Sequence, residues 1–367
     1  MNAYILRALA LTLASVSLAG CGADSQDKSV SSAASGRGTG ITGAGSTFAY
    51  PLFSRWSADF AEKTGTQVNY QSIGSGGGIR QFSELTVDFG ATDSPMTDEE
   101  MARAKGKDVL HIPIALGAVV ITYNVPEVKE PLTLDGAVLT DLFLGKITRW
   151  NDPRIAGLNP GVSLPAQDVL VVHRSDGSGT TFVMTDYLAA VSPDWARSPG
   201  RGKEVQWPVG LGAKGNEGVA GQVKQTPGSV GYVELAYAKQ NNLQVARLKN
   251  AAGQIVEPTV ASITAAAAGA ADSLPASTDY RISIINAPGA ESYPISTFTW
   301  ALVYNSQQDA EKGKSLVDFL RYGLSDDGQR AATALDYAPL PTTMRDRLLQ
   351  RIDSMQIGAA APGTPRD

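Results

Sequence analysis

The sequence predicts an α/β fold with largely parallel sheets, and two observations lead to this prediction. Segments with helical and with strand-like hydrophobic patterns alternate along the chain, the order that parallel strands with crossover helices require. Among the 367 residues, 38 are glycine and 20 are proline, whereas only 18% are charged. That composition suits many short connections between strands and helices, and it argues against a coiled coil or a disordered chain.

Length and charge limit the kinds of protein that this sequence can encode. A chain of 367 residues with 43% hydrophobic positions can bury a good core and is long enough for two domains. The formal net charge is -5, and the sequence contains no long basic run. A nucleic-acid partner is therefore not expected.

The first helix is predicted within residues 48–65, "FAYPLFSRWSADFAEKTG". Leu52, Trp56 and Phe60 recur every four residues, the spacing of one face of an amphipathic helix. Gly65 follows directly and is a typical helix stop. The next segments read in turn as a strand, a glycine-rich turn that enters a helix, and a short buried strand: "QVNYQSI" (67–73), "GSGGGIRQFSEL" (74–85) and "VDFGATDSP" (87–95).

The middle of the chain continues this alternation. Residues 111–125, "HIPIALGAVVITYNV", are apolar over a length that fits an extended segment crossing between two lobes. Residues 168–191, "DVLVVHRSDGSGTTFVMTDYLAAV", again read as strand, turn and helix. Residues 261–279 read as a weak helix and a loop, and nothing in them indicates a function.

Residues 1–20 are expected to be an export signal rather than part of the fold. The apolar run "ALALTLASVS" is shorter than the about 20 residues that a membrane-spanning helix needs. The tetrad at 18–21, "LAGC", resembles the bacterial lipobox, in which the cysteine is lipidated and becomes the first residue of the mature protein. Cys21 is the only cysteine, so a thiol reserved for an anchor explains the count; the alternative is an ordinary signal ending near a chance cysteine.

The predicted signal sets the expected location of the protein. Residues 21–40 are rich in Ser, Gly, Ala and Asp and are expected to form a flexible tether. The folded body would then begin at Ile41 and work in the periplasm, anchored to a membrane through lipidated Cys21.

Three glycine-rich turns share one pattern, and each precedes a helix-like run. They are "GAGST" (Gly43 to Thr47), "GSGGG" (Gly74 to Gly78) and "DGSGT" (Asp176 to Thr180). A helix N-terminus presents unpaired N–H groups and partial positive charge, and glycine lets a ligand approach them closely. A single turn of this kind is more simply explained as a helix cap. Three of them, with Arg174 beside the third, favour a shared site for a tetrahedral anion.

Two carboxylates indicate which anion this is. Asp93 lies at the end of a short apolar strand, where parallel α/β sheets place ligand residues. An ionised carboxylate only accepts hydrogen bonds, so it suits phosphate, which carries a proton near neutral pH, and repels sulfate, which does not. Asp176 is positioned to hold Arg174 through a bidentate pair. The alternative is that Asp93 merely caps the turn before Pro95.

From Ile41 to Pro341 the sequence resembles the phosphate-binding protein of the bacterial phosphate-specific ABC importer. The segments that carry the resemblance are "TGAGSTF", "VNYQSIGSGGG", "TVDFGATDSPM", "LGKITRWNDPRIAGLNPG", "VVHRSDGSGT", "WPVGLGAKGNEG" and "GSVGYVELAYAKQNNL". The resemblance implies that phosphate is bound by Thr47, Phe48, Ser75, Asp93, Arg174, Ser178, Gly179 and Thr180, with Asp176 orienting Arg174. Gly76 and His173 depart from residues common in the family, and neither is an implied ligand.

The resemblance also implies a two-lobed, hinged fold of the periplasmic-binding-protein type. One lobe would comprise residues 41–115 and 294–367, and the other residues 116–293. The chain would cross between them at "IALGAVVI" and return at "PISTFTWALVY". The implied protein is a monomer without a cofactor that delivers phosphate to an inner-membrane ABC permease and its ATPase subunits.

The rival prediction is an exported phosphate-ester hydrolase that uses Ser178. Ser178, His173 and one of the two aspartates supply the residue types of a hydrolytic triad. No serine lies in a G-x-S-x-G elbow, however, and the sequence favours binding over catalysis, with no catalytic residue.

A surface scaffold or adhesin would explain the anchor but not the three turns. The segment "GLGAKG" at 210–215 matches a dinucleotide fingerprint only weakly, and two histidines do not predict a metal site.

Overall fold

The computed structural model describes residues 39–270 and 279–358, all within one compact unit, Arg37–Asp367. The predicted export signal, the lipidation site Cys21 and all but the end of the predicted tether lie outside the described residues. Among the residues that are described, no helix combines the length and apolarity that a membrane crossing requires.

A nine-stranded mixed sheet forms the centre of the fold. Its strands follow the order β2-β1-β3-β12-β4-β8-β6-β7, and β9 pairs with β4. The strands are β1 (Ile41–Gly45), β2 (Val68–Ser72), β3 (Phe89–Thr92), β4 (Val109–Tyr123), β6 (Leu170–Arg174), β7 (Leu211–Ala213), β8 (Ser229–Glu234), β9 (Gln244–Val245) and β12 (Ser296–Tyr304).

The sheet contains two parallel groups joined by antiparallel strands. The first group is β2-β1-β3 and the second is β8-β6-β7. Between them, β12 pairs antiparallel with both β3 and β4, and the last residues of β4 pair antiparallel with β8. The prediction of largely parallel sheets thus holds within each group and is wrong for the centre.

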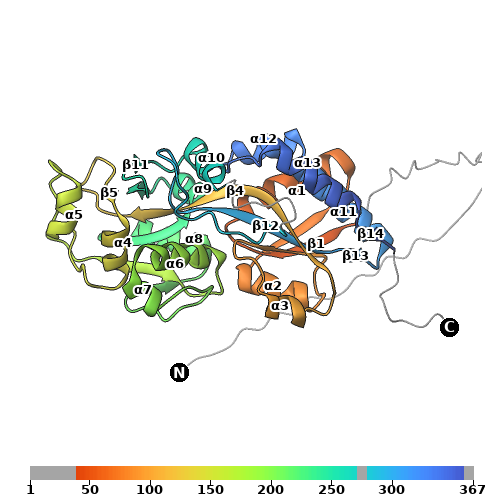
Figure 1. Cartoon of the computed structure of the whole chain (residues 1–367), viewed down its shortest axis with the longest axis horizontal. Coiled ribbons are helices and arrows are strands. Elements are labelled where there is room, and N and C mark those ends of the chain that lie inside the picture. The colour runs from red at the N-terminus through yellow and green to blue at the C-terminus, as the bar shows by residue number, and fades with distance from the viewer. Residues whose placement is uncertain (1–38, 271–278, 359–367) are drawn as a thin grey trace, which may run out of the picture. The chain divides into compact units, whose positions relative to one another are not determined.

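The long strand β4 connects the two groups. Its residues 109–118 pair with β12, and residues 119–123 pair with β8. Nearly every residue of β4 and all of β12 are buried, which explains their continuous apolar sequences. Both segments predicted to cross between lobes are therefore extended strands, and they lie side by side (Figure 1). The lobe boundaries themselves stay a prediction.

Helices connect and cover these strands. They are α1 (Tyr50–Thr64), α2 (Ser75–Ser83), α3 (Asp98–Arg103), α4 (Gly136–Phe143), α5 (Pro153–Leu158), α6 (Gly179–Val191), α7 (Pro193–Arg197), α8 (Gly215–Gln225), α9 (Leu235–Gln240), α10 (Val260–Gly269), α11 (Ala310–Leu324), α12 (Asp326–Thr333) and α13 (Thr342–Asp353). Short strands form two further small sheets, β11-β10-β5 (Ile255–Val256, Arg247–Lys249, Thr133–Leu134) and β13-β14 (Ser306–Gln307, Gln356–Ile357).

The helix α1 follows its sequence pattern closely. It buries Leu52, Phe53, Trp56 and Phe60, and it ends at Gly65 in the left-handed conformation, with φ of 74°. This residue is where the sequence placed the stop, because glycine adopts positive φ without strain.

The fold places the three predicted turns at the carboxyl ends of parallel strands. The turn after β1 enters α1, the turn after β2 enters α2, and the turn after β6 enters α6. The helix α2 packs tightly on the first group, since a Cβ added at Gly78 would lie 2.3 Å from the Cα atom of Gly45. Such closeness requires glycine at position 78.

Candidate functional site

The second and third turns contact each other. The N–H of Gly76 donates to the carbonyl oxygen of Gly177 at 2.8 Å. A Cβ added at Gly179 would lie 2.5 Å from both Asp93 Oδ2 and Ser75 Oγ. The N-terminus of α6 therefore lies directly against Ser75, the first residue of α2, and Asp93, which follows β3.

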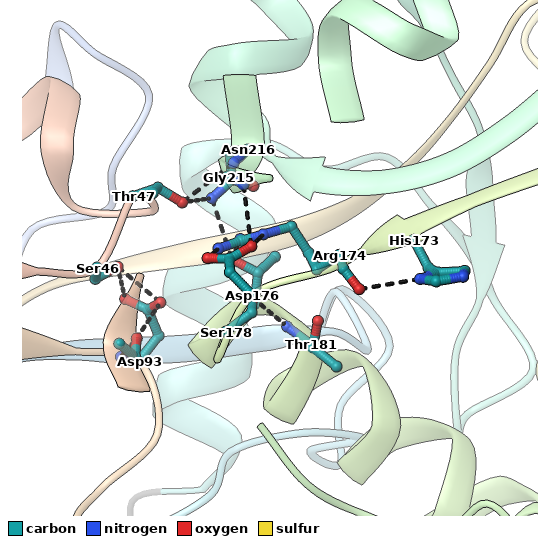
Figure 2. A network of polar contacts seen from close by, with 12 residues as sticks. Ser46, Thr47, Asp93, His173, Arg174, Asp176, Ser178, Thr181, Gly215 and Asn216 are labelled. Carbon is teal, nitrogen blue, oxygen red and sulfur yellow. Dashed lines mark hydrogen bonds and ion pairs between the residues drawn. The ribbon is translucent and has the colours of Figure 1, made fainter. Parts of the chain in front are cut away.

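The first turn joins the same site through Asn216. Thr47 Oγ1 accepts the side-chain N–H of Asn216 at 2.8 Å, and the same amide donates to Thr180 Oγ1 at 3.1 Å. Asn216 lies in the first turn of α8. All three predicted turns thus meet in one place, and Figure 2 shows Thr47, Asp93, Arg174 and Ser178 around it.

Asp93 is buried in a shell of hydroxyl groups. Its carboxylate accepts hydrogen bonds from Ser46 Oγ at 2.6 and 2.7 Å, from Thr299 Oγ1 at 2.8 Å and from Ser75 Oγ at 3.4 Å. The alternative that it caps the turn before Pro95 is wrong, because Thr92 Oγ1 makes the hydrogen bonds to Ser94 there.

The environment of Asp93 changes its acidity. Burial raises its pKa to about 6, and the hydrogen bonds from Ser46 and Thr299 together with the charge of Arg174 limit that rise. Asp93 is therefore mostly ionised at neutral pH, where its carboxylate is a hydrogen-bond acceptor only.

Arg174 and Asp176 form the bidentate pair expected from the sequence. Arg174 Nε donates to Asp176 Oδ1 at 2.7 Å, and Nη2 donates to Oδ2 at 2.5 Å. Gly215 N–H also donates to Asp176 Oδ1, at 3.0 Å. Burial alone would raise the pKa of Asp176, but the hydrogen bond and the charge of Arg174 outweigh it and hold that pKa below its usual value.

The guanidinium group of Arg174 uses only part of its hydrogen-bonding capacity within the described residues. Arg174 Nη1 donates to Thr180 Oγ1 at 3.3 Å, so three of the five N–H groups of a guanidinium face Asp176 and Thr180. The Arg174 side chain is only 1% exposed. Its orientation is therefore fixed by Asp176 and Thr180.

The third turn caps the helix α6. Ser178 Oγ accepts the N–H of Thr181 at 3.0 Å, and Ser178 N–H donates to the carbonyl oxygen of Lys203 at 3.0 Å. Because the Ser178 oxygen accepts that bond, its hydroxyl proton is free to point elsewhere. Gly179 and Thr180 begin the helix, where main-chain N–H groups have no partner within the helix.

Phe48 follows the first turn, and its ring and its main chain are both held by Tyr337. Its ring is buried and packs edge-to-face against Tyr337, with the ring centroids 6.2 Å apart. The carbonyl oxygens of Thr47 and Phe48 accept the hydroxyls of Tyr237 and Tyr337, at 2.6 and 2.5 Å. These two tyrosines hold the main chain of the first turn in place.

The charged side chains of the site carry no net positive charge. Arg174 carries one positive charge, which Asp176 neutralises, and Asp93 adds a negative one. An anion would therefore be stabilised mainly by dipoles: hydroxyl groups, helix N-termini and main-chain N–H groups.

Several residues of the site escaped sequence reasoning. Ser46 lies inside the first turn motif but was not singled out, and Asn216 lies in the segment "KGNEG" next to the weak dinucleotide motif. Thr299, Tyr237 and Tyr337 come from distant parts of the chain, and no local pattern marks them. The motif "GLGAKG" contains the short strand β7, which lies at the exposed edge of the sheet. A dinucleotide site would instead place the motif in a turn after a strand, so this context does not fit one.

Comparison with known proteins identifies the family. A model described as a PBP superfamily domain matches residues 29–327. The phosphate-binding protein PstS of Xylella fastidiosa (strain 9a5c) is 46% identical over 305 residues, which cover 83% of this chain and 82% of that protein. The chain belongs to the PstS family of phosphate-binding proteins. The PstS protein of Pasteurella multocida is 45% identical, with 86% of this chain and 89% of the relative covered.

Solved structures share the fold of this PstS-family chain. The phosphate-binding protein of Stenotrophomonas maltophilia superposes with a TM-score of 0.64 at 21% identity, covering 85% of this chain and 93% of that one. A putative phosphate ABC transporter substrate-binding protein with bound phosphate, from Clostridium perfringens, gives a TM-score of 0.60 at 17% identity, with 82% and 100% covered. The predicted two-lobed α/β fold of the periplasmic-binding-protein type is confirmed.

The hydrolase alternative has no support in the PstS family or in the geometry. The His173 ring stacks on Trp207, with centroids 4.9 Å apart, and its Nδ1 faces the carbonyl oxygen of Arg174 at 3.0 Å. Within the described residues, no hydrogen bond joins His173 to Ser178, and Ser178 instead caps α6. The relationship of nucleophile to base that a triad requires is therefore missing there.

Proposed function

We propose that this protein binds inorganic phosphate with high affinity outside the cytoplasm and delivers it to an ABC permease for import. The observation that carries the proposal is the combination of many donors with one buried acceptor. Hydroxyl and main-chain N–H groups from three turns meet beside the carboxylate of Asp93. The PstS relatives are named for the same ligand.

We propose eight ligands for the anion at this meeting point. They are Thr47, Phe48, Ser75, Asp93, Arg174, Ser178, Gly179 and Thr180, with Asp176 as the residue that orients Arg174. Phosphate near neutral pH has a proton to donate to ionised Asp93, whereas sulfate has none. A site built around a ligand's donor can reject an analogue lacking it by roughly 10⁴-fold or more. We therefore propose that Asp93 is the basis of selectivity, and that the protein has no catalytic role.

Closure of two lobes around the anion is part of the proposal, with residues 41–115 and 294–367 in one lobe and 116–293 in the other. Ion pairs join residues assigned to different lobes: Lys203 to Glu100 at 2.6 Å, Arg281 to Asp98 at 2.7 Å and Lys239 to Asp336 at 2.6 Å. A ligand that contacts both lobes favours the closed state through its differential affinity.

The remaining proposals concern location and assembly. The protein would be a periplasmic monomer anchored to a membrane through lipidated Cys21, and its partners would be the inner-membrane permease and the ATPase subunits. The wild type should then incorporate labelled fatty acid, whereas a Cys21→Ser variant should incorporate none. A wild type that incorporates no label, or a variant that incorporates as much as the wild type, would contradict the anchor.

Uptake of labelled phosphate tests the whole function. Cells lacking the protein should regain high-affinity uptake when they express the wild type, but not when they express Arg174→Ala at an equal level. Equal uptake with both versions would contradict the proposal.

A further inference from the structure

Asn216 bridges two threonines that are both proposed phosphate ligands. Its side-chain Nδ2 donates one hydrogen bond to Thr47 Oγ1 at 2.8 Å and one to Thr180 Oγ1 at 3.1 Å. Its main-chain N–H also donates to Thr47 Oγ1, at 3.2 Å. Asn216 is fully buried at the start of α8. Figure 2 shows it next to Thr47.

A main-chain contact fixes which way the amide points. The N–H of Glu234 donates to Asn216 Oδ1 at 2.9 Å. Since a main-chain N–H can only donate, the amide oxygen must face Glu234 and the NH2 group must face the two threonines. The orientation of Asn216 therefore follows from chemistry rather than from the choice between two similar atoms.

The hydrogen bonds to Thr47 and Thr180 leave each hydroxyl able to donate its proton but unable to accept another bond. A hydroxyl has two acceptor positions and one proton. Thr47 Oγ1 accepts two N–H groups from Asn216, and Thr180 Oγ1 accepts one from Asn216 and one from Arg174 Nη1 at 3.3 Å. Both acceptor positions of both hydroxyls are thus occupied, so each must donate its proton to whatever it meets next.

We propose that Asn216 is a positioning residue that commits the hydroxyls of Thr47 and Thr180 to donating, so that phosphate oxygens meet two fixed donors. This inference rests on the proposed function. In this proposal two residues determine the specificity of the site. Asp93 accepts the proton of the ligand, and Asn216 ensures that the two threonine hydroxyls accept no proton from it. Because Thr47 and Thr180 come from different strand groups, Asn216 aligns donors on both sides of the ligand.

The Asn216→Asp variant tests the proposal because it keeps the shape and reverses the polarity. A carboxylate oxygen in place of Nδ2 would accept the protons of both threonines and place a negative charge near the anion. Loss of two oriented donors predicts that phosphate affinity falls at least about 100-fold at pH 8. Protonation of the introduced carboxylate would restore one donor, so the ratio of wild-type to variant affinity should decrease toward pH 5.5.

The matched control is Asn159→Asp. Asn159 is also buried and donates two hydrogen bonds from Nδ2, to the carbonyl oxygens of Thr133 and Ile155 at 2.9 Å each. It lies away from the proposed ligands, at the end of α5. Its phosphate affinity should stay within about threefold of wild type, and the ratio should not depend on pH.

Calorimetric titration of the full chain with inorganic phosphate between pH 5.5 and 8 separates the outcomes. A large, pH-dependent loss in Asn216→Asp alone supports the inference. An Asn216→Asp variant that binds like the wild type overturns it and leaves the proposed function standing. A wild type that does not bind phosphate overturns the proposed function and this inference with it.

A double-mutant cycle keeps the proposal testable where Asn216→Asp does not fold. Asn216→Ala should weaken phosphate binding much less in a Thr180→Val background than in the wild type, because part of its effect passes through that hydroxyl. Additive losses would overturn the inference, since a residue that only supports α8 would act independently of Thr180.

Discussion

Gly179, the first residue of α6, lies directly against the carboxylate of Asp93. A Cβ at Gly179 would be 2.5 Å from Asp93 Oδ2 and 2.8 Å from Asp93 Cβ. Contacts this short have no room for a methyl group. The N-terminus of one helix thereby reaches the acidic residue that we propose as the basis of selectivity.

Gly179→Ala should weaken phosphate binding by at least about 100-fold, because the methyl group would force α6 away from Asp93 or displace the carboxylate. Titration calorimetry measures the loss. The control is Gly221→Ala in the interior of α8, where an added Cβ has no neighbour within 4 Å. That change should leave affinity unaltered and stabilise the helix by about 0.5–1 kcal/mol. If Gly179→Ala bound phosphate as tightly as the wild type, α6 could move away from Asp93 without loss of affinity, and this prediction would be wrong.

Asp93→Asn should reduce discrimination against sulfate. An amide can donate to an oxyanion where the carboxylate only accepts, so sulfate would gain a partner and phosphate would lose its proton acceptor. Competition of sulfate against labelled phosphate measures the change. Selectivity that stays unchanged in this variant would remove Asp93 from its assigned role.

Asp93 should also make the ligand-free protein less stable as pH rises. Its pKa in the fold is raised from 3.8 to about 6 by burial, so the folded state binds the proton more tightly than the unfolded state. The stabilisation is complete below about pH 4 and is lost as pH rises through 6. The size of the effect is at most about 3 kcal/mol.

Denaturant unfolding at pH 4 and pH 7 checks this linkage. The comparison that matters is between wild type and Asp93→Asn, because other buried groups, including Glu234, titrate in both proteins. The wild type should lose more stability than the variant over that interval. An identical pH dependence in the two proteins would mean that the pKa of Asp93 is not raised.

Arg174→Ala should weaken the binding of phosphate and of other oxyanions alike. The change removes two free guanidinium donors, each worth about 1.5–3 kcal/mol toward a charged acceptor, so the loss is expected to exceed about 100-fold. It also leaves Asp176 without its partner, and Arg174→Ala/Asp176→Ala should recover part of the affinity by removing that negative charge. A double variant weaker than the single one would show that Asp176 contacts the ligand in its own right.

Lys203→Met should weaken phosphate binding about twofold to fivefold, as expected for a partly exposed ion pair. Lys203 Nζ pairs with Glu100 at 2.6 Å, and the Lys203 carbonyl holds the N–H of Ser178. Lys146→Met is the control, because Lys146 pairs with Asp194 at 2.9 Å inside a single proposed lobe. The difference between the two variants should vanish at about 1 M salt, which screens such pairs. A difference that persists at high salt would exclude an ionic origin.

The sequence was sufficient for the parts of the site that local patterns encode. Each of the three turns couples a strand end to a helix start, so the turns and Arg174 beside the third could be located from the local pattern. The individual ligands within the turns, such as Thr47 and Ser75, were implied only by the family resemblance. Asp93 was correctly placed at a strand end for the same reason. Alternation of helices and strands gave the class of the fold.

The rest depends on contacts between distant segments. Thr299 reaches Asp93 only because β12 pairs with β3, and Asn216 reaches Thr47 across 169 positions of the chain. Apolar runs such as residues 111–125 do not reveal whether their neighbours are parallel or antiparallel, so the antiparallel centre of the sheet was not predicted. Polar residues inside ordinary elements give no periodic signal of a role in binding.

Titration of the wild-type chain with phosphate and then with sulfate tests the central claim most directly, after bound ligand has been removed by unfolding and refolding. We predict tight binding of phosphate and no measurable response to sulfate at neutral pH. Binding of both anions with similar affinity would contradict the role of Asp93, and refolded protein that binds neither would contradict the anion site itself.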